Sequence, residues 1–195
     1  GGPADSVTGR AGLSATAGFD VKLAPSPALT LDLTANTDFA QAEADRQVVN
    51  LSRFPLFFPE QRTFFTEGAG IFDFGRTQQT QLFYSRRIGL DTSGAAIPLH
   101  AGARLIGRIG SEQVGLLAVR TGGAQPATDV VARVKHDVLG RGYVGAMATL
   151  QQVNGQPLSP AGGADFNLPY IVNGQNLVLI GTIAAQRDSA GGNTA

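Results

Sequence analysis

Apolar and polar residues alternate strictly near the start of the chain. Between Leu13 and Leu23 every second residue is apolar, and the residues between them are small, polar or charged. After a turn signal at residues 24–27 the alternation returns from Leu29 to Asn36. Because the side chains of a strand point alternately to its two faces, both stretches predict strands with one apolar and one polar face. Together they predict a β-hairpin.

The second half of the chain continues this pattern. Further strands are predicted near residues 99–109, 113–121, 129–138, 143–151 and 176–185. Most have about the 9–11 residues with which a tilted strand crosses a bilayer, whereas strands of soluble proteins average about 5–6. The predicted turns are short at 110–112 and 139–142, and longer at 122–128 and 153–173. A membrane barrel has the same asymmetry between its two ends.

Two architectures fit such strands, a soluble β-sandwich and a membrane β-barrel. The polar faces carry Arg, Asp, Ser, Thr and Gly, whereas a water-facing sheet is typically rich in Lys, Glu and Thr. The apolar faces carry small aliphatic residues, which a lipid-facing surface tolerates because it has no cavity to fill. Tyr84, Tyr143 and Tyr170 give only a thin aromatic girdle. The pattern favours an all-β fold: an antiparallel up-and-down transmembrane β-barrel segment, incomplete, with about eight or nine strands.

The stretch from Asn36 to Gly75 does not alternate. It holds eight of the chain's eleven phenylalanines and six of its fifteen acidic residues. Burial of one phenylalanine is favourable by about 1.5–3 kcal/mol, so the segment is expected to dock on another part of the protein. Pro55 and Pro59 exclude a continuous helix. In a barrel, residues 36–75 would form an inserted plug-like segment in the lumen or at its mouth.

Charged residues of this segment and of the strands form the predicted site. The acids of the segment would meet strand arginines in two-point Arg–carboxylate pairs, in a partly dry interior. Residues 86–89 are expected to form a strand whose two arginines point to opposite faces. The predicted plug and lumen ion-pair residues are Asp38, Glu43, Asp45, Glu60, Arg62, Glu67, Arg86, Arg87, Arg104 and Arg108.

Composition narrows the classes of function. Basic and acidic residues number 15 each, so the net charge is zero and no nucleic-acid partner is expected. Charged residues make up 15% of the chain, against about 25% in soluble domains, and 43% hydrophobic residues argue against disorder. The absence of cysteine excludes disulfides and thiolate metal sites. No apolar run predicts a membrane helix and no signal peptide opens the chain, so residues 1–195 are expected to be a fragment of one β-barrel domain.

Candidate catalytic and metal-binding residues are few. Asp38, Glu43 and Asp45 lack the residue order of a calcium loop. Glu60 and Glu67 could act as the general acid and base of a glycoside hydrolase, but their separation in sequence does not define their separation in space. No catalytic residue, metal site or cofactor is therefore predicted, and enzymatic activity stays an open alternative.

Several motifs follow one another in the first half of the chain. They are Asn36-Thr37-Asp38-Phe39, Gln41-Ala42-Glu43-Ala44-Asp45, Val49-Asn50-Leu51, Phe57-Phe58-Pro59-Glu60-Gln61-Arg62-Thr63-Phe64-Phe65 and Arg86-Arg87-Ile88-Gly89. The set resembles a family of uncharacterised bacterial envelope proteins, in which proline usually stands where this chain has Thr37. Members commonly join an N-terminal module, similar to family-nine carbohydrate-binding modules, to a large C-terminal domain of unknown function. The resemblance implies an outer-membrane β-barrel but supplies no activity, and the carbohydrate-binding module is missing from these residues.

The expected function is that of an outer-membrane β-barrel protein of the Gram-negative envelope, in transport or surface binding. Outer-membrane lipid is the expected partner, and glycans are candidate ligands of the full-length protein. One alternative is a soluble all-β binding module in which the Phe-rich segment is simply core. Another is an envelope glycoside hydrolase. Resistance to extraction by carbonate or high salt separates the membrane barrel from the soluble module.

Overall fold

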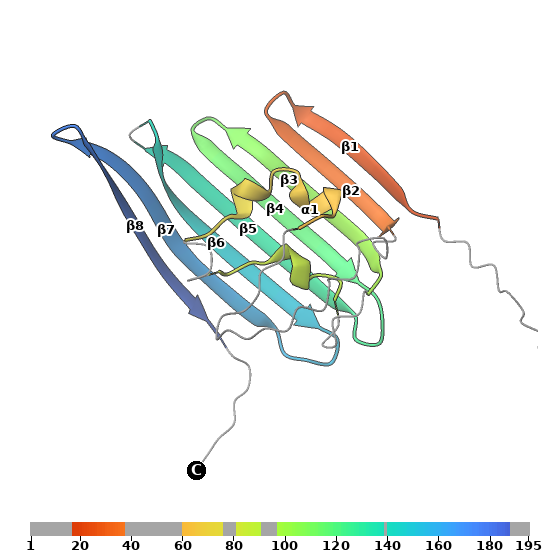
Figure 1. The fold of residues 1–195 in the computed structure, drawn as a ribbon. Coiled ribbons are helices and arrows are strands. Elements are labelled where there is room, and N and C mark those ends of the chain that lie inside the picture. Colours follow the sequence, from red (N-terminus) through yellow and green to blue (C-terminus); the bar gives the residue numbers. More distant parts are fainter. Residues whose placement is uncertain (1–16, 38–59, 76–80, 91–96, 139, 188–195) are drawn as a thin grey trace, which may run out of the picture.

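The computed structural model describes residues 17–37, 60–75, 81–90, 97–138 and 140–187. Within these ranges eight strands form one antiparallel sheet in the order of the chain (Figure 1). They are β1 Phe19–Ser26, β2 Leu29–Thr37, β3 Leu99–Ile109, β4 Glu112–Thr121, β5 Ala127–Val138, β6 Gly142–Val153, β7 Ser159–Val172 and β8 Gln175–Gln186. The sheet is not closed, and β1 and β8 are its two edges. The predicted all-β, up-and-down architecture and the open sheet are confirmed.

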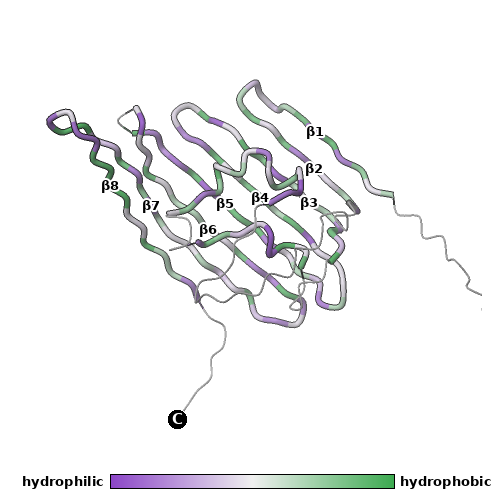
Figure 2. Tube along the Cα trace, viewed as in Figure 1, coloured by the Kyte–Doolittle hydropathy of each residue, from purple (hydrophilic) through white to green (hydrophobic). Residues whose placement is uncertain are grey.

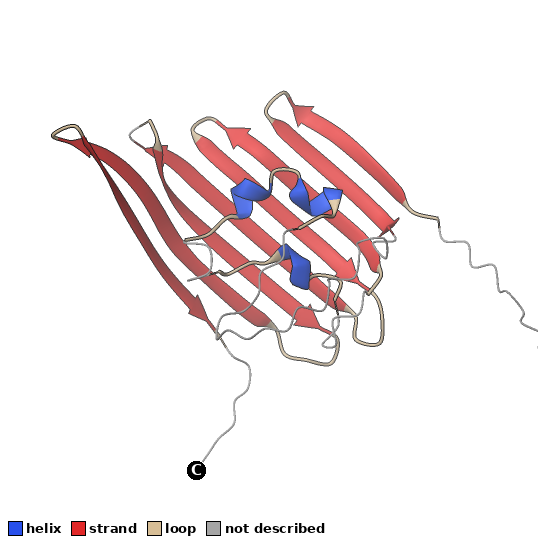
Figure 3. Cartoon of the chain, in the orientation of Figure 1, coloured by secondary structure: helices blue, strands red, loops and turns tan. Residues whose placement is uncertain are grey.

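Three short helices lie over one face of this sheet (Figure 3). They are α1 Thr63–Thr66, η2 Ala69–Phe72 and η3 Ser85–Arg87, of which the last two are 3₁₀ helices. All three belong to the connection between β2 and β3. Among the described residues, no helix has the length and apolar character needed to cross a membrane.

The two ends of the sheet differ in their connections. At one end β3 joins β4 through Gly110 and Ser111, and β7 joins β8 through Asn173 and Gly174. Asn173 and Gly174 both have positive φ, which gives a two-residue hairpin turn the twist of its strands. At the other end the connections are longer, at residues 122–126, 154–158 and 38–98. The predicted asymmetry is present, although the first turn lies at residues 27–28 rather than 24–27.

The prediction of a long loop at residues 153–173 is wrong, because most of these residues form strand β7. Two prolines conceal this strand in the sequence, since proline lacks the N–H that a sheet ladder uses. Pro160 is paired with Leu150 of β6, and Pro169 with Val178 of β8. The prolines lie near the two ends of β7, where the ladder tolerates them.

The sheet has one covered face and one open face, and these differ in chemistry. The helices pack on the covered face, where Leu117, Val119, Val131 and Met147 form a core with Phe65, Phe72, Phe74 and Ile88. The open face is almost entirely apolar, and Ile183, Phe19 and Leu116 are 73%, 59% and 49% exposed on it. Figure 2 shows hydrophobic and hydrophilic positions following one another along several of the strands.

A β-bulge changes the face of one predicted residue. The sequence pattern places Leu99 with Ala101 on the apolar face of its strand. The register of β3 against β4 shifts between these two residues, so Leu99 pairs with Thr121 and turns to the covered face. Its side chain is fully buried there. One extra residue in a strand reverses the face of everything beyond it, which no alternation count can anticipate.

Candidate functional site

The polar side of the sheet is occupied by residues 60–75 and 81–90, which we call the covering segment. Its aromatic rings lie where the sheet has no side chains. A Cβ atom on Gly102 would lie 2.9 Å from the Phe64 ring, and one on Gly163 would lie 2.7 Å from the Phe74 ring. Glycine on the covered face therefore makes room for the phenylalanines of the covering segment.

Arg104 of β3 connects the covering segment to the sheet. Its guanidinium pairs with Asp32 of β2 and, at 2.9 Å, with the Glu67 carboxylate. It also donates hydrogen bonds to the backbone carbonyls of Phe64, at 2.6 Å, and Glu67. The Arg104 side chain is only 2% exposed, so these contacts replace its water almost completely. Arg104 thus holds the α1 turn against the sheet.

Glu67 has a second cationic partner on the sheet. Lys22 of β1 donates to both of its carboxylate oxygens, at 2.6 and 2.7 Å. The hydrogen bond from Lys22, followed by that from Arg104, lowers the pKa of Glu67 below its ordinary value. Glu67 therefore stays ionised and links β1, β3 and the covering segment.

A second ion pair lies deeper under the covering segment. Arg133 of β5 binds Asp165 of β7 in two-point geometry, at 2.7 and 2.9 Å, and neither side chain is exposed. Asp165 also accepts hydrogen bonds from the Tyr143 hydroxyl, at 3.1 Å, and from the backbone N–H of Gly75, at 3.0 Å. Arg133 Nε has no hydrogen-bond partner among the described residues. The Gly75 contact fixes the part of the covering segment that follows η2 to the sheet.

Lys135 of β5 makes a third tie. Its ammonium donates to the backbone carbonyl of Gly70 at 2.6 Å, and the residue is 6% exposed. Buried charges are costly unless they are paired or hydrogen-bonded. The covering segment supplies backbone carbonyls and N–H groups that meet this need for Arg104, Lys135 and Asp165.

Glu60 and Arg62 form a staple inside the covering segment. The Arg62 guanidinium pairs with Glu60 at 2.8 Å and donates to the carbonyls of Ser85 and Ile88, at 2.8 and 2.6 Å. Glu60 also accepts a hydrogen bond from the Ser85 hydroxyl at 2.6 Å. Burial alone would raise the pKa of Glu60, but the bonds from Arg62 and Ser85 outweigh it and lower the pKa to about 2. The staple joins the two halves of the covering segment.

The structure changes several predicted partners. The sequence predicts a strand arginine as the partner of Glu60, but Glu60 pairs with Arg62 in its own segment. Arg86 and Arg87 lie on η3 rather than on a strand, so they do not point to opposite faces of the sheet. Arg108 pairs with Asp137 of β5, near the short turns, where both side chains are substantially exposed. Asp38, Glu43 and Asp45 lie outside the described residues.

Sequence reasoning missed three members of the buried pairs, Asp32, Arg133 and Asp165, as site residues. Arg133 stands on a predicted polar face, and so does Asp32, but nothing in the sequence indicates which of several polar positions meet. Asp165 falls in the unrecognised β7. The signal that could have located it is the alternation of Asp165 and Asn167 with Ala164, Phe166 and Leu168.

The arrangement is suited to holding the covering segment against the sheet. Its buried charged side chains form ion pairs with one another and hydrogen bonds with the backbone of the covering segment. Among the described residues, no group of three or more potential ligands could hold a metal ion.

No curated protein and no solved structure matches this chain. Residues 3–112, more than half of the chain, match the family described as Domain of unknown function (DUF5916). The stretch matched contains β1, β2, β3 and the covering segment. The chain therefore belongs to the DUF5916 family.

Proposed function

We propose that the sheet is part of the wall of a β-barrel in the outer membrane of a Gram-negative bacterium. Its open face touches hydrocarbon, its covered face looks into the lumen, and the covering segment acts as a plug. The protein would serve in transport or in binding at the cell surface. One observation carries this proposal: the aliphatic face is the one left open, while the buried arginines lie on the other.

On β4 and β5 a pair of polar residues borders the open face at each end. Towards the short turns, Glu112 and His136 are cross-strand neighbours and contact each other at 2.6 Å. Towards the long connections, Arg120 donates to Thr128 at 2.7 Å. Between these pairs β4 and β5 present only aliphatic side chains: Val114, Leu116, Ala118, Val130, Ala132 and Val134. On these two strands the open face is thus an apolar band with polar edges.

The height of this band suits a bilayer. Arg120 lies eight positions after Glu112, which is about 27 Å along a strand and about 21 Å once a strand tilt of about 40° is included. The lipid-facing band of outer-membrane barrels is roughly 25 Å tall. Long side chains at the two edges can extend towards the head groups.

A soluble module explains the same sheet less well. Soluble monomers rarely leave a continuous apolar patch of more than a few hundred Å² in water. A second protein layer could cover the band. However, the charged residues of this sheet are buried under the covering segment, whereas a soluble sheet would keep its charged residues in water. The glycoside hydrolase is not favoured either, because a general acid needs a raised pKa and that of Glu60 is lowered to about 2.

The two edge strands of the sheet have features that favour pairing with further strands. Val178 and Leu179 of β8 are 47% and 46% exposed although they point to opposite faces. An unpaired apolar edge is an aggregation hazard that barrels remove by closure. We infer that β1 and β8 each pair with a further strand of the complete barrel.

The experiment uses the full-length protein with any native cysteine replaced. Single cysteines are then introduced into this cysteine-free background. This chain itself contains none. Leu116→Cys and Ala146→Cys lie in the band, and Ser111→Cys and Gln125→Cys lie in connections at the two ends. Each is labelled with bimane in outer-membrane vesicles and exposed to two quenchers, a nitroxide on a lipid acyl chain and aqueous iodide.

The proposal expects nitroxide to quench bimane at the two band positions and iodide to quench it at the two end positions. Quenching of the band positions by iodide would place the face in water. Insensitivity of the band positions to both quenchers would mean that another protein layer covers them. Either result contradicts a lipid-facing wall.

A further inference from the structure

A pocket of about 240 Å³ lies between the covering segment and the strands β5 to β8. It sits towards the long connections, where Asp129, Gln151 and Ser159 are in register on three neighbouring strands. The charges described above hold the covering segment elsewhere on the sheet. None of the buried ion pairs contributes a side chain to this pocket.

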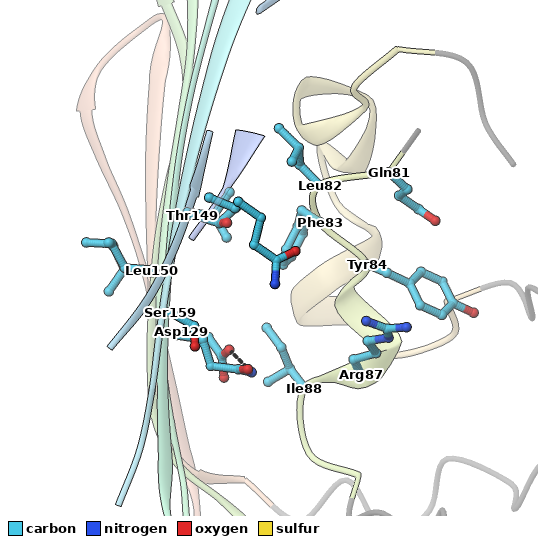
Figure 4. A pocket seen from close by; sticks show the side chains of 15 residues that line it. Gln81, Leu82, Phe83, Tyr84, Arg87, Ile88, Asp129, Thr149, Leu150 and Ser159 are labelled. Carbon is cyan, nitrogen blue, oxygen red and sulfur yellow. Dashed lines mark hydrogen bonds between the residues drawn. The ribbon is translucent and has the colours of Figure 1, made fainter. Parts of the chain in front are cut away.

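The two walls of the pocket differ in chemistry (Figure 4). Leu82, Phe83 and Ile88 point from the covering segment towards the sheet and form the apolar part of the roof, which Gln81, Tyr84 and Arg87 also line. The sheet forms a floor of hydrogen-bonding side chains. These are Asp129, Thr149, Gln151, Ser159 and Gln186, and apolar residues such as Val131 and Ala161 lie among them.

Several side-chain oxygens of the floor make no hydrogen bond within the described residues. Gln151 Nε2 donates to Asp129 Oδ1 at 2.8 Å. In the part of the chain that the structure describes, Asp129 Oδ2 and the hydroxyls of Thr149 and Ser159 have no partner. A carboxylate oxygen and two hydroxyls, spread over β5, β6 and β7, thus face the same cavity.

Size and charge limit the ligand. Pockets for drug-sized molecules measure about 300–1,000 Å³, so this one has room for a single small ring. Asp129 and Arg87 are its only charged lining residues among those described, and their charges are opposite. A neutral molecule suits the pocket better than a strong anion or cation.

We propose that the pocket binds one pyranose ring of a neutral saccharide. Such a ring carries hydroxyls around its edge and C–H groups on its faces. The hydroxyls would bind Asp129, Thr149 and Ser159, while one face of the ring lies against Phe83. This names a ligand class for the proposed role in surface binding or transport. The chemistry of the pocket does not depend on a membrane, so the two proposals can fail separately.

The test uses the full-length protein purified in a detergent without a sugar head group. Methyl glucoside, methyl galactoside, methyl xyloside and N-acetylglucosamine are titrated and binding is followed by saturation-transfer NMR, with glycine and glutamate as zwitterionic and acidic competitors. Asp129→Asn and Thr149→Val are the pocket variants. Asp137→Asn on the same strand and Thr182→Val on the same face are the controls, since neither lines the pocket.

We expect saturable binding of at least one sugar. Asp129→Asn should weaken it about tenfold or more, Thr149→Val about threefold to tenfold, and the controls by less than about twofold. The proposal is overturned if no sugar binds, if binding is equal in all variants and so lies elsewhere in the protein, or if the amino acids compete through the pocket. Unchanged heat-dependent gel mobility identifies variants that remain folded. Bimane quenching at Leu116 is unaffected by any of these outcomes and reports on the membrane proposal alone.

Discussion

Arg133 of β5 and Asp165 of β7 pair across the intervening strand β6, above Gly145. Gly145 is in register with Asp165, and a Cβ atom there would lie 2.9 Å from Arg133 Nη1. The missing side chain on β6 is what lets the guanidinium reach the carboxylate. The pair therefore depends on a residue that carries no charge and makes no hydrogen bond with its own side chain.

Gly145→Val should break this pair and destabilise the protein by about 3–5 kcal/mol, because two buried charges lose their partner. Ala146→Val adds two methyl groups to the neighbouring residue on the open face and should change stability by less than about 1 kcal/mol. Urea unfolding of both variants in lipid vesicles measures the difference. Equal stability of the two would show that the pair forms without help from the glycine.

Substitutions of Arg133 and Asp165 should have non-additive effects on the free energy of unfolding. Asp165→Leu alone leaves Arg133 buried without a carboxylate and should cost about 3–5 kcal/mol. Arg133→Met combined with Asp165→Leu removes both charges and should recover a large part of that loss. A double-mutant cycle by urea unfolding measures the coupling. If the two losses simply add, the contacts of Asp165 with Tyr143 and Gly75 matter more than the ion pair.

Arg104 and Arg108 offer a matched comparison on one strand. Both lie on the same face of β3, but the Arg104 side chain is 2% exposed and that of Arg108 is 48% exposed. Arg104→Met should release α1 from the sheet, since it removes two ion pairs and two bonds to backbone carbonyls. Arg108→Met should cost no more than about 1 kcal/mol, as is usual for an exposed pair.

The readout for these two variants is limited proteolysis of the full-length protein in vesicles. Cleavage within residues 60–75 should accelerate at least tenfold in Arg104→Met and stay near the parent rate in Arg108→Met. Equal rates in both variants would show that the covering segment is held mainly by its phenylalanines.

Acid should loosen the staple formed by Glu60. Its pKa is lowered from 4.5 to about 2, so the unfolded carboxyl takes up a proton before the folded one does. The stabilisation is therefore complete above about pH 4.5 and disappears as the pH falls towards 2. It amounts to about 3 kcal/mol at most, from the standard conversion of a pKa difference into free energy.

Glu60→Gln tests this dependence. The parent should be more stable than the variant at pH 6, and the gap should close between pH 4.5 and 2. Hydrogen exchange of the Ser85 to Ile88 backbone, measured across this range, follows the staple locally. A gap that is constant with pH would mean that ionisation of Glu60 contributes nothing.

A charge placed on the open face should have an effect that depends on depth, if that face meets lipid. Ala132→Arg lies in the middle of the band and should cost about 2–4 kcal/mol in a bilayer, whereas His136→Arg at its edge should cost about 0–1 kcal/mol. Urea unfolding in vesicles provides both values. Small and equal costs at the two positions are what a water-exposed sheet would give.

The period-two alternation predicted most of the sheet, because most of its strands have one apolar and one polar face. It failed where the alternation is interrupted by proline in β7 and by the bulge between Leu99 and Ala101. The hydrophobicity of the phenylalanines, not the alternation, predicted that the Phe-rich segment packs on the protein, and Phe65, Phe72 and Phe74 are buried. Hydrophobicity requires burial but does not say where.

Partner choice was beyond the sequence for a different reason. Glu60 finds Arg62 two residues away, whereas Arg133 finds Asp165 across an intermediate strand. Which cation meets which acid depends on register, on the path of the covering segment and on gaps such as the one at Gly145. None of these follows from the identity of the charged residues themselves.

The backbone of Thr37 pairs with that of Leu99, so the chain rejoins the sheet directly beside the place where it left. Everything between these two residues is an excursion that leaves the register of β2 and β3 untouched. Doubling the length of such an excursion costs only about 0.6 kcal/mol in closure entropy. The sheet and the segment inserted between β2 and β3 can therefore diverge in sequence at different rates, and a foreign segment grafted between the same two residues would leave the pairing of these strands intact.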